Sequence, residues 1–300
     1  MKITSEQKNM LLGTVLVLLA GILWSTVGIY VRSLRAAGLS TWDITLVRMS
    51  VSVLSMALYL VPFHREWLCV RFKDLWIFAG AGILSLLCMN YCYSESIQVS
   101  SLAVAGTLLY TAPIFVMLMS LLFFREKMTG RKLLALLLAF AGCALVSGIA
   151  GSEFTMTTKA LFLGLGSGFS YALYSIFGRV ALDRNYDSWT ITFYAFVFGM
   201  AACTLLAEPG KIVAAAMADA ALLLPMVLLG VTTGFAAYLL YTIGLTKLEP
   251  GRASIIASLE LVSAAVLGVI AFQETIDLSA AVGIALLLCA VVVLNVQKKK

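Results

Sequence analysis

The fold is decided by a stretch that occurs twice, first as WSTVGIYVRSLRAAGLSTWDIT at residues 24–45 and again as YALYSIFGRVALDRNYDSWTIT at residues 171–192. Six informative positions correspond at this offset of 147 residues: four pairs are identical, and the other two exchange one aromatic residue for another. The pairs are Trp24 and Tyr171, Tyr30 and Phe177, Arg32 and Arg179, Trp42 and Trp189, Ile44 and Ile191, and Thr45 and Thr192. The second half of the chain therefore repeats the first.

A looser match extends the repeat through the rest of each half. With one more residue of offset, four positions of the first half meet their counterparts: Gly82 and Gly230, Tyr93 and Tyr241, Phe124 and Phe272, and Glu126 and Glu274. Each copy holds five apolar segments, and an odd number of spans gives the two copies opposite orientations in a bilayer. Inverted repeats are typical of transporters, whose halves open alternately around one central site.

The composition is that of an integral membrane protein. Charged residues make up 12% and hydrophobic residues 62% of the chain, whereas soluble domains contain roughly 25% charged residues. The mean hydropathy is +1.01. A helix needs roughly 20 apolar residues to cross a bilayer, and apolar runs near this length predict an all-α integral membrane fold of ten transmembrane helices in two inverted five-helix repeats. The first repeat has spans at residues 10–31, 43–61, 75–94, 101–124 and 133–149. The second has spans at residues 160–178, 189–207, 221–243, 253–272 and 279–296.

These spans divide the chain into a cytoplasmic N-terminus at residues 1–9, a first repeat at 10–149, an outer linker at 150–159, a second repeat at 160–296 and a basic cytoplasmic C-terminus at 297–300. Of the Lys and Arg residues, 16 fall on the side of the termini, 4 on the opposite side and one, Arg48, within a span. Because basic loops resist translocation, both termini are predicted to be cytoplasmic, in a multi-pass protein of the inner or plasma membrane. The net charge of +6 thus reflects topology and indicates no nucleic-acid partner.

The sequence offers little for catalysis or for a cofactor. The six cysteines form no C-x-x-C pair, the single histidine is His64, and no Walker-type loop occurs. We therefore expect no enzyme activity, no metal and no cofactor, with energy supplied by a proton or ion gradient. A passive channel or uniporter and an intramembrane enzyme are the alternative functions. A channel would need a continuous polar stripe, and an enzyme would need a nucleophile–base pair or a metal cluster.

Glu260 is the costliest residue of the chain to place in a membrane. It lies eight positions into the span at 253–272, where an ionised carboxylate costs roughly 2.5 kcal/mol or more. Such a group is tolerated where it faces a cavity or a partner, so Glu260 is the first candidate for a substrate site. It would bind an amine, carry a coupling proton, or form a structural hydrogen bond with a neighbouring helix.

Aromatic residues at helical spacing are the second candidate feature. If they face one cavity with Glu260, their rings would enclose a cation or an aromatic ring. The alternative is that they serve helix packing and the interfacial belts. Asn90 adds an amide at depth, which together with Glu260 would orient a zwitterion. The aromatic residues of this predicted box are Trp24, Tyr91, Tyr171, Tyr174, Tyr238 and Tyr241.

Arg48 and Pro113 are candidates for structural or gating roles. The Arg48 stem can reach the interface, pair with Asp43 about one turn away, or bind a substrate carboxylate. The absence of other Lys or Arg at this depth argues against phosphorylated or strongly anionic substrates, which need concentrated positive charge. Pro113 removes a backbone hydrogen bond and is predicted to kink the span at 101–124, either as a static bend or as a gate.

Seven short motifs are spread over nearly the whole chain: Leu23-Trp24-Ser25, Leu46-Val47-Arg48, Tyr91-x-Tyr93-Ser94, Thr111-Ala112-Pro113-Ile114, Phe124-Arg125-Glu126, Leu259-Glu260-Leu261 and Phe272-Gln273-Glu274. Together they resemble the drug/metabolite transporter superfamily, in particular its ten-helix EamA-type exporters. One position departs from the resemblance, because similar proteins often have a proline where Leu261 stands. We therefore expect the break in the span at 253–272 to be softened or absent.

The resemblance implies a central cavity lined by spans one, three, four, six, eight and nine, with spans five and ten at the periphery. It also implies movement of small metabolites, often amino acids or amines and commonly outward. The predicted function is a secondary active transporter, an exporter of a small amine, amino acid or related metabolite, that works by alternating access around a central cavity. Its partners are the small-molecule substrate and the lipid bilayer, and the chain acts as a monomer or a homodimer.

Overall fold

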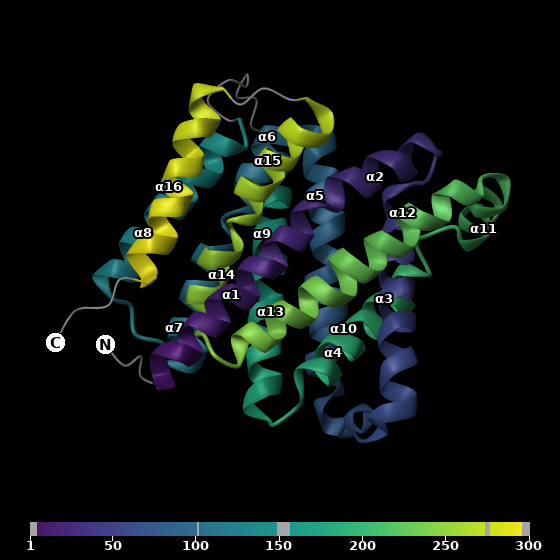
Figure 1. Cartoon of the computed structure of the whole chain (residues 1–300), viewed down its shortest axis with the longest axis horizontal. Helices are drawn as coiled ribbons and strands as arrows, with labels where there is room; N and C mark the ends of the chain where they lie inside the picture. Colours follow the sequence, from purple (N-terminus) through teal and green to yellow (C-terminus); the bar gives the residue numbers. More distant parts are fainter. Residues whose placement is uncertain (1–4, 101, 149–156, 274–276, 296–300) are drawn as a thin grey trace.

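The computed structural model describes residues 5–100, 102–148, 157–273 and 277–295. These residues form helices and short connections, and no strand occurs among them, which confirms the all-α prediction. Figure 1 shows the arrangement. The α-helices are α1 (Ser5–Ser25), α2 (Val27–Ala36), α3 (Thr41–Phe63), α4 (Leu75–Ala79), α5 (Cys88–Val99), α6 (Leu102–Leu109), α7 (Ala112–Phe124), α8 (Gly130–Val146), α9 (Thr158–Asp183), α10 (Ser188–Cys203), α11 (Pro209–Ala218), α12 (Leu223–Leu228), α13 (Ala237–Leu245), α14 (Pro250–Ala257), α15 (Glu260–Phe272) and α16 (Leu278–Asn295).

Seven stretches of helix in the described part of the chain are long and apolar enough to cross a membrane. Several of them join two or more of the helices above, as α1 and α2 do. The helices α10 and α16 are apolar but shorter, and α8 begins with two basic residues in its first turn. The multi-pass membrane fold is thus confirmed, and the count of ten spans stays a prediction. The seven stretches are Gln7–Ala36, Thr41–Phe63, Phe72–Val99, Val104–Phe124, Thr158–Asp183, Ala220–Leu245 and Pro250–Ala271.

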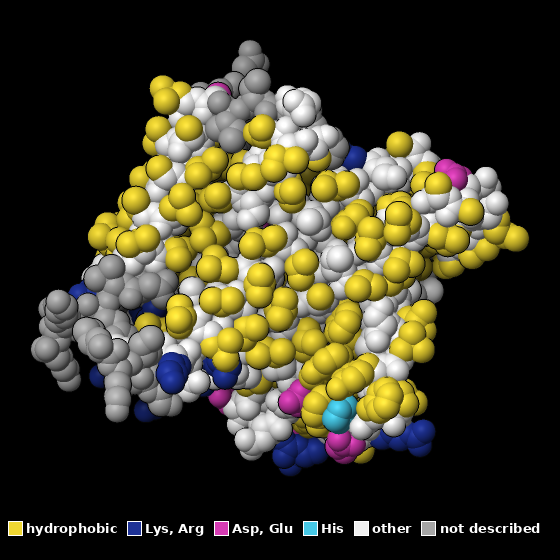
Figure 2. Space-filling view, viewed as in Figure 1, with side chains coloured by type: hydrophobic (Ala, Val, Ile, Leu, Met, Phe, Trp, Pro, Cys, Tyr) yellow, Lys and Arg dark blue, Asp and Glu magenta, His cyan; other side chains and the backbone are white. Residues whose placement is uncertain are grey.

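The two ends of the bundle differ in charge. We call the end at which α1 begins and α16 ends the inner end, because the sequence predicts it to be cytoplasmic, and the opposite end the outer end. In the view of Figure 2, hydrophobic side chains cover the middle of the molecule and most Lys and Arg side chains lie along its lower, inner edge. Large apolar side chains such as Leu122, Phe162 and Ile270 are about 70% exposed. Soluble monomers rarely expose so much apolar surface, whereas a bilayer covers it.

The inverted repeat is visible in irregularities that occur at equivalent positions. A π-helical segment follows α4 at Gly80–Leu87 and another follows α12 at Leu229–Ala236. The matched glycines Gly82 and Gly230 lie in these segments. A Cβ on Gly82 would lie 2.7 Å from the backbone nitrogen of Gly199, and one on Gly230 would lie 3.2 Å from the Arg48 carbonyl oxygen. Each π segment therefore packs its backbone closely against a neighbouring helix.

Two spans are broken at matching positions. The break between α6 and α7 falls at residues 110–111, and the break between α14 and α15 falls at residues 258–259. The helices α7 and α15 that follow are both 13 residues long, and their C-caps, Arg125 and Gln273, are left-handed with φ of 54° and 56°. The second break is present, so the expectation that it would be absent is wrong, although Ser258 and Leu259 keep right-handed helical backbone angles. Pro113 occupies the first turn of α7, whereas α15 begins without a proline, so the proline accompanies the break but is not required for it.

The helices α8 and α16 lie side by side at the edge of the bundle (Figure 1), in the peripheral position expected for spans five and ten. They meet at Gly142 and Gly283. A Cβ on Gly142 would lie 2.8 Å from the carbonyl oxygen of Gly283 and 2.9 Å from Cγ of Leu287. The missing side chains thus allow the two backbones to touch, as small residues commonly do between membrane helices.

Gly142→Ala is expected to lower the free energy of unfolding by about 1–3 kcal/mol, because the added methyl group must push the two backbones apart. The matched control is Gly130→Ala in the same helix, where an added Cβ meets no described atom within 4 Å. Alanine favours helix over glycine at both positions, so the difference between the variants isolates the packing term. Thermal unfolding in detergent measures it, and equal melting temperatures for the two variants would show that the seam is loose.

Candidate functional site

Glu260 is the first residue of α15 and therefore stands directly after the break in its span. Its Oε1 accepts a hydrogen bond of 2.5 Å from the hydroxyl of Tyr110, which lies in the equivalent break between α6 and α7. Tyr171 of α9 also interacts with this carboxylate. The amino end of α15 adds the positive end of a helix dipole. The two breaks thus meet in the middle of the bundle, as discontinuous helices do at transporter sites.

A cavity of about 270 Å³, called the central cavity below, lies beside this carboxylate. Pockets that hold drug-sized ligands occupy roughly 300–1,000 Å³, so the central cavity suits a smaller solute. It is lined by residues of α1, α2, α3, α5, both broken spans, α9 and α13. These residues are Trp24, Ser25, Val27, Gly28, Arg48, Met89, Leu109, Tyr110, Tyr171, Tyr238, Glu260 and Ala264.

Aromatic rings form one wall of the central cavity. The Trp24 ring contacts Tyr238 edge-on with the centroids 5.0 Å apart, and it meets Tyr171 at 6.4 Å in the same manner. Tyr174 and Tyr241, which were predicted to line the cavity, lie behind these rings. Their hydroxyls are engaged elsewhere, with Thr242 at 3.0 Å and with Ser175 at 2.7 Å. The two tyrosines therefore brace the aromatic wall from behind.

Two donors at the central cavity have no acceptor among the described residues. They are the indole Nε1 of Trp24 and the Nε of Arg48, and both atoms are buried. Asp43, the predicted partner of Arg48, is engaged elsewhere: it accepts from the backbone and hydroxyl of Ser40 at 2.9 and 2.7 Å and from the backbone nitrogen of Glu208 at 2.8 Å. The predicted pairing of Arg48 with Asp43 is therefore wrong. Within the described part of the chain, neither Arg48 nor Glu260 forms a salt bridge.

Two further predicted members of the site, Tyr91 and Asn90, lie outside the central cavity. Tyr91 is 48% exposed and stacks on Trp42 at the surface of the bundle, with the ring centroids 6.0 Å apart. The Asn90 amide donates to the Leu86 carbonyl at 2.7 Å and borders a neighbouring cavity of about 160 Å³ that also contacts Arg48. Both side chains miss the central cavity because a π-helical segment ends at Leu87, just before them. Its wider turns rotate the following residues relative to a regular α-helix.

Tyr93 and Tyr110 are site residues that the sequence reading missed. Tyr93 borders the 160 Å³ cavity and an outer cavity of about 430 Å³. Tyr110 borders the outer cavity, the central cavity and a small inner cavity that Pro113 also lines. Signals for both existed: Tyr93 matches Tyr241 in the repeat, and Tyr110 directly precedes the Thr111-Ala112-Pro113 motif.

The sequence matches the EamA-like transporter family at residues 11–148 and 158–296. The chain therefore belongs to this family, within the drug/metabolite transporter superfamily. The match falls in two blocks, one in each half of the chain. The Phe272-Gln273-Glu274 motif that contributed to the resemblance ends at Glu274, which lies outside the described residues.

Relatives with similar sequences bear the name of transporters. An uncharacterized transporter of Archaeoglobus fulgidus is 27% identical over 94% of this chain and 95% of its own length. The uncharacterized transporter YetK of Bacillus subtilis is 23% identical over 85% of this chain and 78% of its own. A solved crystal structure with 17% identity superposes with a TM-score of 0.78 over 94% of this chain and 96% of its own, which shows a shared fold. Fold and relatives together indicate a membrane transporter.

Proposed function

We propose that the protein is a secondary active transporter that exports a small zwitterion, an amino acid or a related metabolite with an amino group, by alternating access around the central cavity. The observation that supports this is the chemistry of the cavity wall. Glu260 offers carboxylate oxygens, and the Nε of Arg48 and the Nε1 of Trp24 are donors without acceptors among the described residues. The ammonium group of a zwitterion would bind Glu260, and its carboxylate would accept hydrogen bonds from Arg48 and Trp24. Hydrogen bonds that involve charged groups are stronger than those between neutral groups.

The aromatic wall supports the same assignment. Tryptophan is the ring type that binds cations best, and Tyr171 and Tyr238 lie against Trp24.

Glu260 is the group that would carry a coupling proton, since a carboxylate in a membrane-embedded cavity is a common proton site. Outward transport follows from the resemblance to EamA-type exporters. The excess of basic residues at the inner end supports cytoplasmic termini and a place in the cell membrane. One chain supplies the whole lining, so a monomer suffices.

Counterflow in proteoliposomes tests the proposal. Vesicles are loaded with one unlabelled solute, and uptake of the labelled solute is followed for zwitterionic amino acids, for the corresponding amines without the carboxylate, and for the N-acetylated acids. We expect saturable counterflow for the zwitterions only. Flux that rises linearly with concentration would support the passive channel instead, and chemical conversion of the solute would support an intramembrane enzyme. No counterflow with any member of the panel would refute the substrate class.

A further inference from the structure

The path through the molecule is wide on the outer side of Tyr110 and nearly closed on its inner side. The outer and central cavities measure about 430 and 270 Å³, whereas the inner cavity measures about 20 Å³. A single water needs roughly 10–15 Å³ of such space, so no solute passes the inner cavity. Its walls come from α7, α9, α13, α14 and the two breaks, with Val116, Ala172 and Ala257 among the lining residues.

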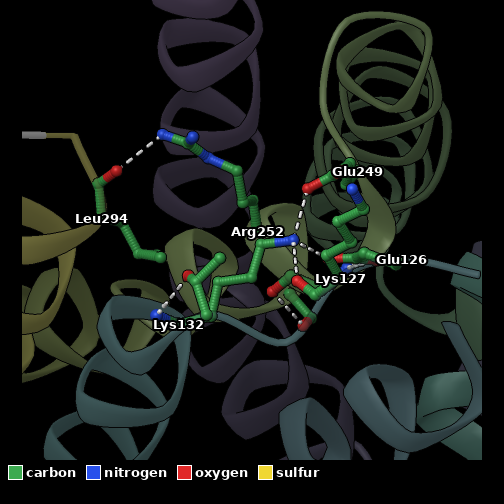
Figure 3. Close-up of polar contacts among 9 residues, drawn as sticks. Glu126, Lys127, Lys132, Glu249, Arg252 and Leu294 are labelled. Carbon is green, nitrogen blue, oxygen red and sulfur yellow. Dashed lines mark hydrogen bonds and ion pairs between the residues drawn. The ribbon is translucent and has the colours of Figure 1, made fainter. Parts of the chain in front are cut away.

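A buried ion cluster ties together the inner ends of α7 and α14, two of the helices that close the inner cavity (Figure 3). Lys132 Nζ donates to Oε1 of Glu126 at 2.8 Å and to Oε2 of Glu249 at 2.6 Å. Glu126 follows the end of α7, and Glu249 precedes α14. Lys132 also donates to the Lys127 carbonyl at 3.1 Å, and Glu126 Oε2 accepts from the Gly251 backbone at 3.4 Å. We call Glu126, Lys132 and Glu249 the inner ion cluster.

The inner ion cluster joins the two repeats in a setting with little water. Glu126 and Lys132 belong to the first repeat and Glu249 to the second. The side chains of Glu126 and Lys132 are only 3% and 10% exposed, whereas that of Glu249 is 52% exposed. Buried ion pairs add little net stability compared with apolar packing, and their best-attested use is to fix one arrangement against another. Separating the repeats here would hydrate the buried charges of Glu126 and Lys132, so the cluster favours the closed arrangement without making it permanent.

A second polar cluster joins the repeats at the same end. The carboxylate of Asp74, just before α4, accepts from Arg184, which directly follows α9, and from the Tyr186 hydroxyl at 2.7 Å. Arg71 donates to Asp74 at 2.7 Å and to the Arg184 carbonyl at 3.3 Å. The inner ends of the two repeats are therefore connected at two separate places.

We propose that the inner ion cluster is a latch: it holds the inner end shut while the cavity faces outward, and it separates each time the cavity opens to the inner side. The proposal rests on the alternating access of the proposed function. It predicts that Lys132, although remote from the central cavity, sets the equilibrium between the two states. Without Lys132 the two carboxylates lose the cation that binds both of them directly, and Arg252, which interacts with both only at longer range, is left to offset their repulsion. The balance therefore shifts toward opening.

Cysteine labelling tests the latch without any knowledge of the substrate. Ser254 lines the inner cavity, so Ser254→Cys reports on access to it. A membrane-impermeant maleimide is applied to inverted vesicles, which expose the inner end, and labelling is quantified residue by residue with mass spectrometry. In the Lys132→Met background we expect the cysteine introduced at position 254 to react about tenfold faster, which corresponds to a tenfold shift of the equilibrium. The native Cys69, exposed in the loop between α3 and α4, is the internal reference.

Matched variants separate the latch from a general effect of charge or folding. Lys127→Met removes the same charge from the same loop, but the Lys127 side chain is exposed and only its backbone carbonyl contacts the cluster. Equal labelling of the introduced cysteine in the Lys127→Met and Lys132→Met backgrounds would overturn the latch. Glu249→Gln, at a half-exposed position, gives a second measurement if Lys132→Met does not fold, and no acceleration there would also overturn it. The exchange Lys132→Glu with Glu249→Lys restores opposite charges and should restore slow labelling.

The labelling and counterflow experiments distinguish failure of the latch from failure of the proposed function. If wild type shows no counterflow with any zwitterion but Lys132→Met still accelerates labelling, the substrate class is wrong and the latch stands. If wild type shows counterflow and labelling is the same in all backgrounds, the latch is wrong and the proposed function stands.

Discussion

Replacing Glu260 with glutamine is expected to reduce counterflow of the zwitterionic substrate by at least about 30-fold. Removing one partner of a buried, hydrogen-bonded charge pair costs about 2–5 kcal/mol, and each 1.4 kcal/mol is about a factor of ten in affinity. Glutamine keeps the size of the side chain and can still accept the 2.5 Å hydrogen bond from Tyr110. The fold and the aromatic wall should therefore persist while the ammonium group loses its counter-charge. Initial counterflow rates measured over a range of substrate concentrations give the loss.

The control for this substitution is Glu208→Gln, which removes a carboxylate from an exposed position at the outer end of the molecule. It should transport as the wild type does, and both variants should show one monodisperse peak in size-exclusion chromatography. An affinity and maximal rate for Glu260→Gln equal to those of the wild type would assign Glu260 to helix packing. The search for the substrate site would then move to Arg48 and the aromatic wall.

The position of Glu260 also shows how function breaks the symmetry of the repeat. Its counterpart, 148 residues earlier, is Ala112, which begins α7 just as Glu260 begins α15. The two breaks are geometrically equivalent, but only the second presents a carboxylate. The partner of that carboxylate, Tyr110, comes from the first break. The site is thus assembled from both repeats, and relative movement of the repeats changes its geometry directly.

The broad architecture was predictable because it depends on properties that add up along the chain. Apolar length identified the membrane segments, and the matches of Trp42 with Trp189 and of Arg32 with Arg179 identified the repeat. The break before Glu260 was expected to be softened or absent, because Leu261 stands where similar proteins often have a proline. The structure forms the break at Ser258 and Leu259, two residues with ordinary helix propensity.

Orientation of side chains around each helix was the weakest part of the prediction. Regular helical spacing placed Tyr91 in the cavity. The π-helical segment ahead of it changes the direction in which the following side chains point, so Tyr91 is exposed and Tyr93 borders the outer cavity and the 160 Å³ cavity. Tyr174 and Tyr241 were predicted to line the cavity, yet their hydroxyls pair with Thr242 and Ser175 behind the aromatic wall. Such pairings depend on which helices are neighbours in space, and hydropathy does not contain that information.

Replacing Arg48 with glutamine is expected to change which solutes the protein accepts. The half-saturation concentration for the zwitterion should rise by about 30-fold or more, since the substrate carboxylate loses a charged partner. The corresponding amine, which has no carboxylate, should compete with the labelled zwitterion as well as it does in the wild type or better, because the uncompensated positive charge of Arg48 is gone. Competition of both solutes against the labelled zwitterion measures this change of preference within one preparation, and a monodisperse peak in size-exclusion chromatography is the control for folding.

Arg48→Lys separates charge from geometry at the same position. Lysine keeps the positive charge but loses the planar fork that binds a carboxylate through two parallel hydrogen bonds. We expect an intermediate affinity for the zwitterion, between those of the wild type and Arg48→Gln. If all three proteins prefer the zwitterion over the amine by the same factor, Arg48 does not contact the substrate carboxylate. The unpaired Trp24 nitrogen would then be the remaining donor to test, with Trp24→Phe as the variant.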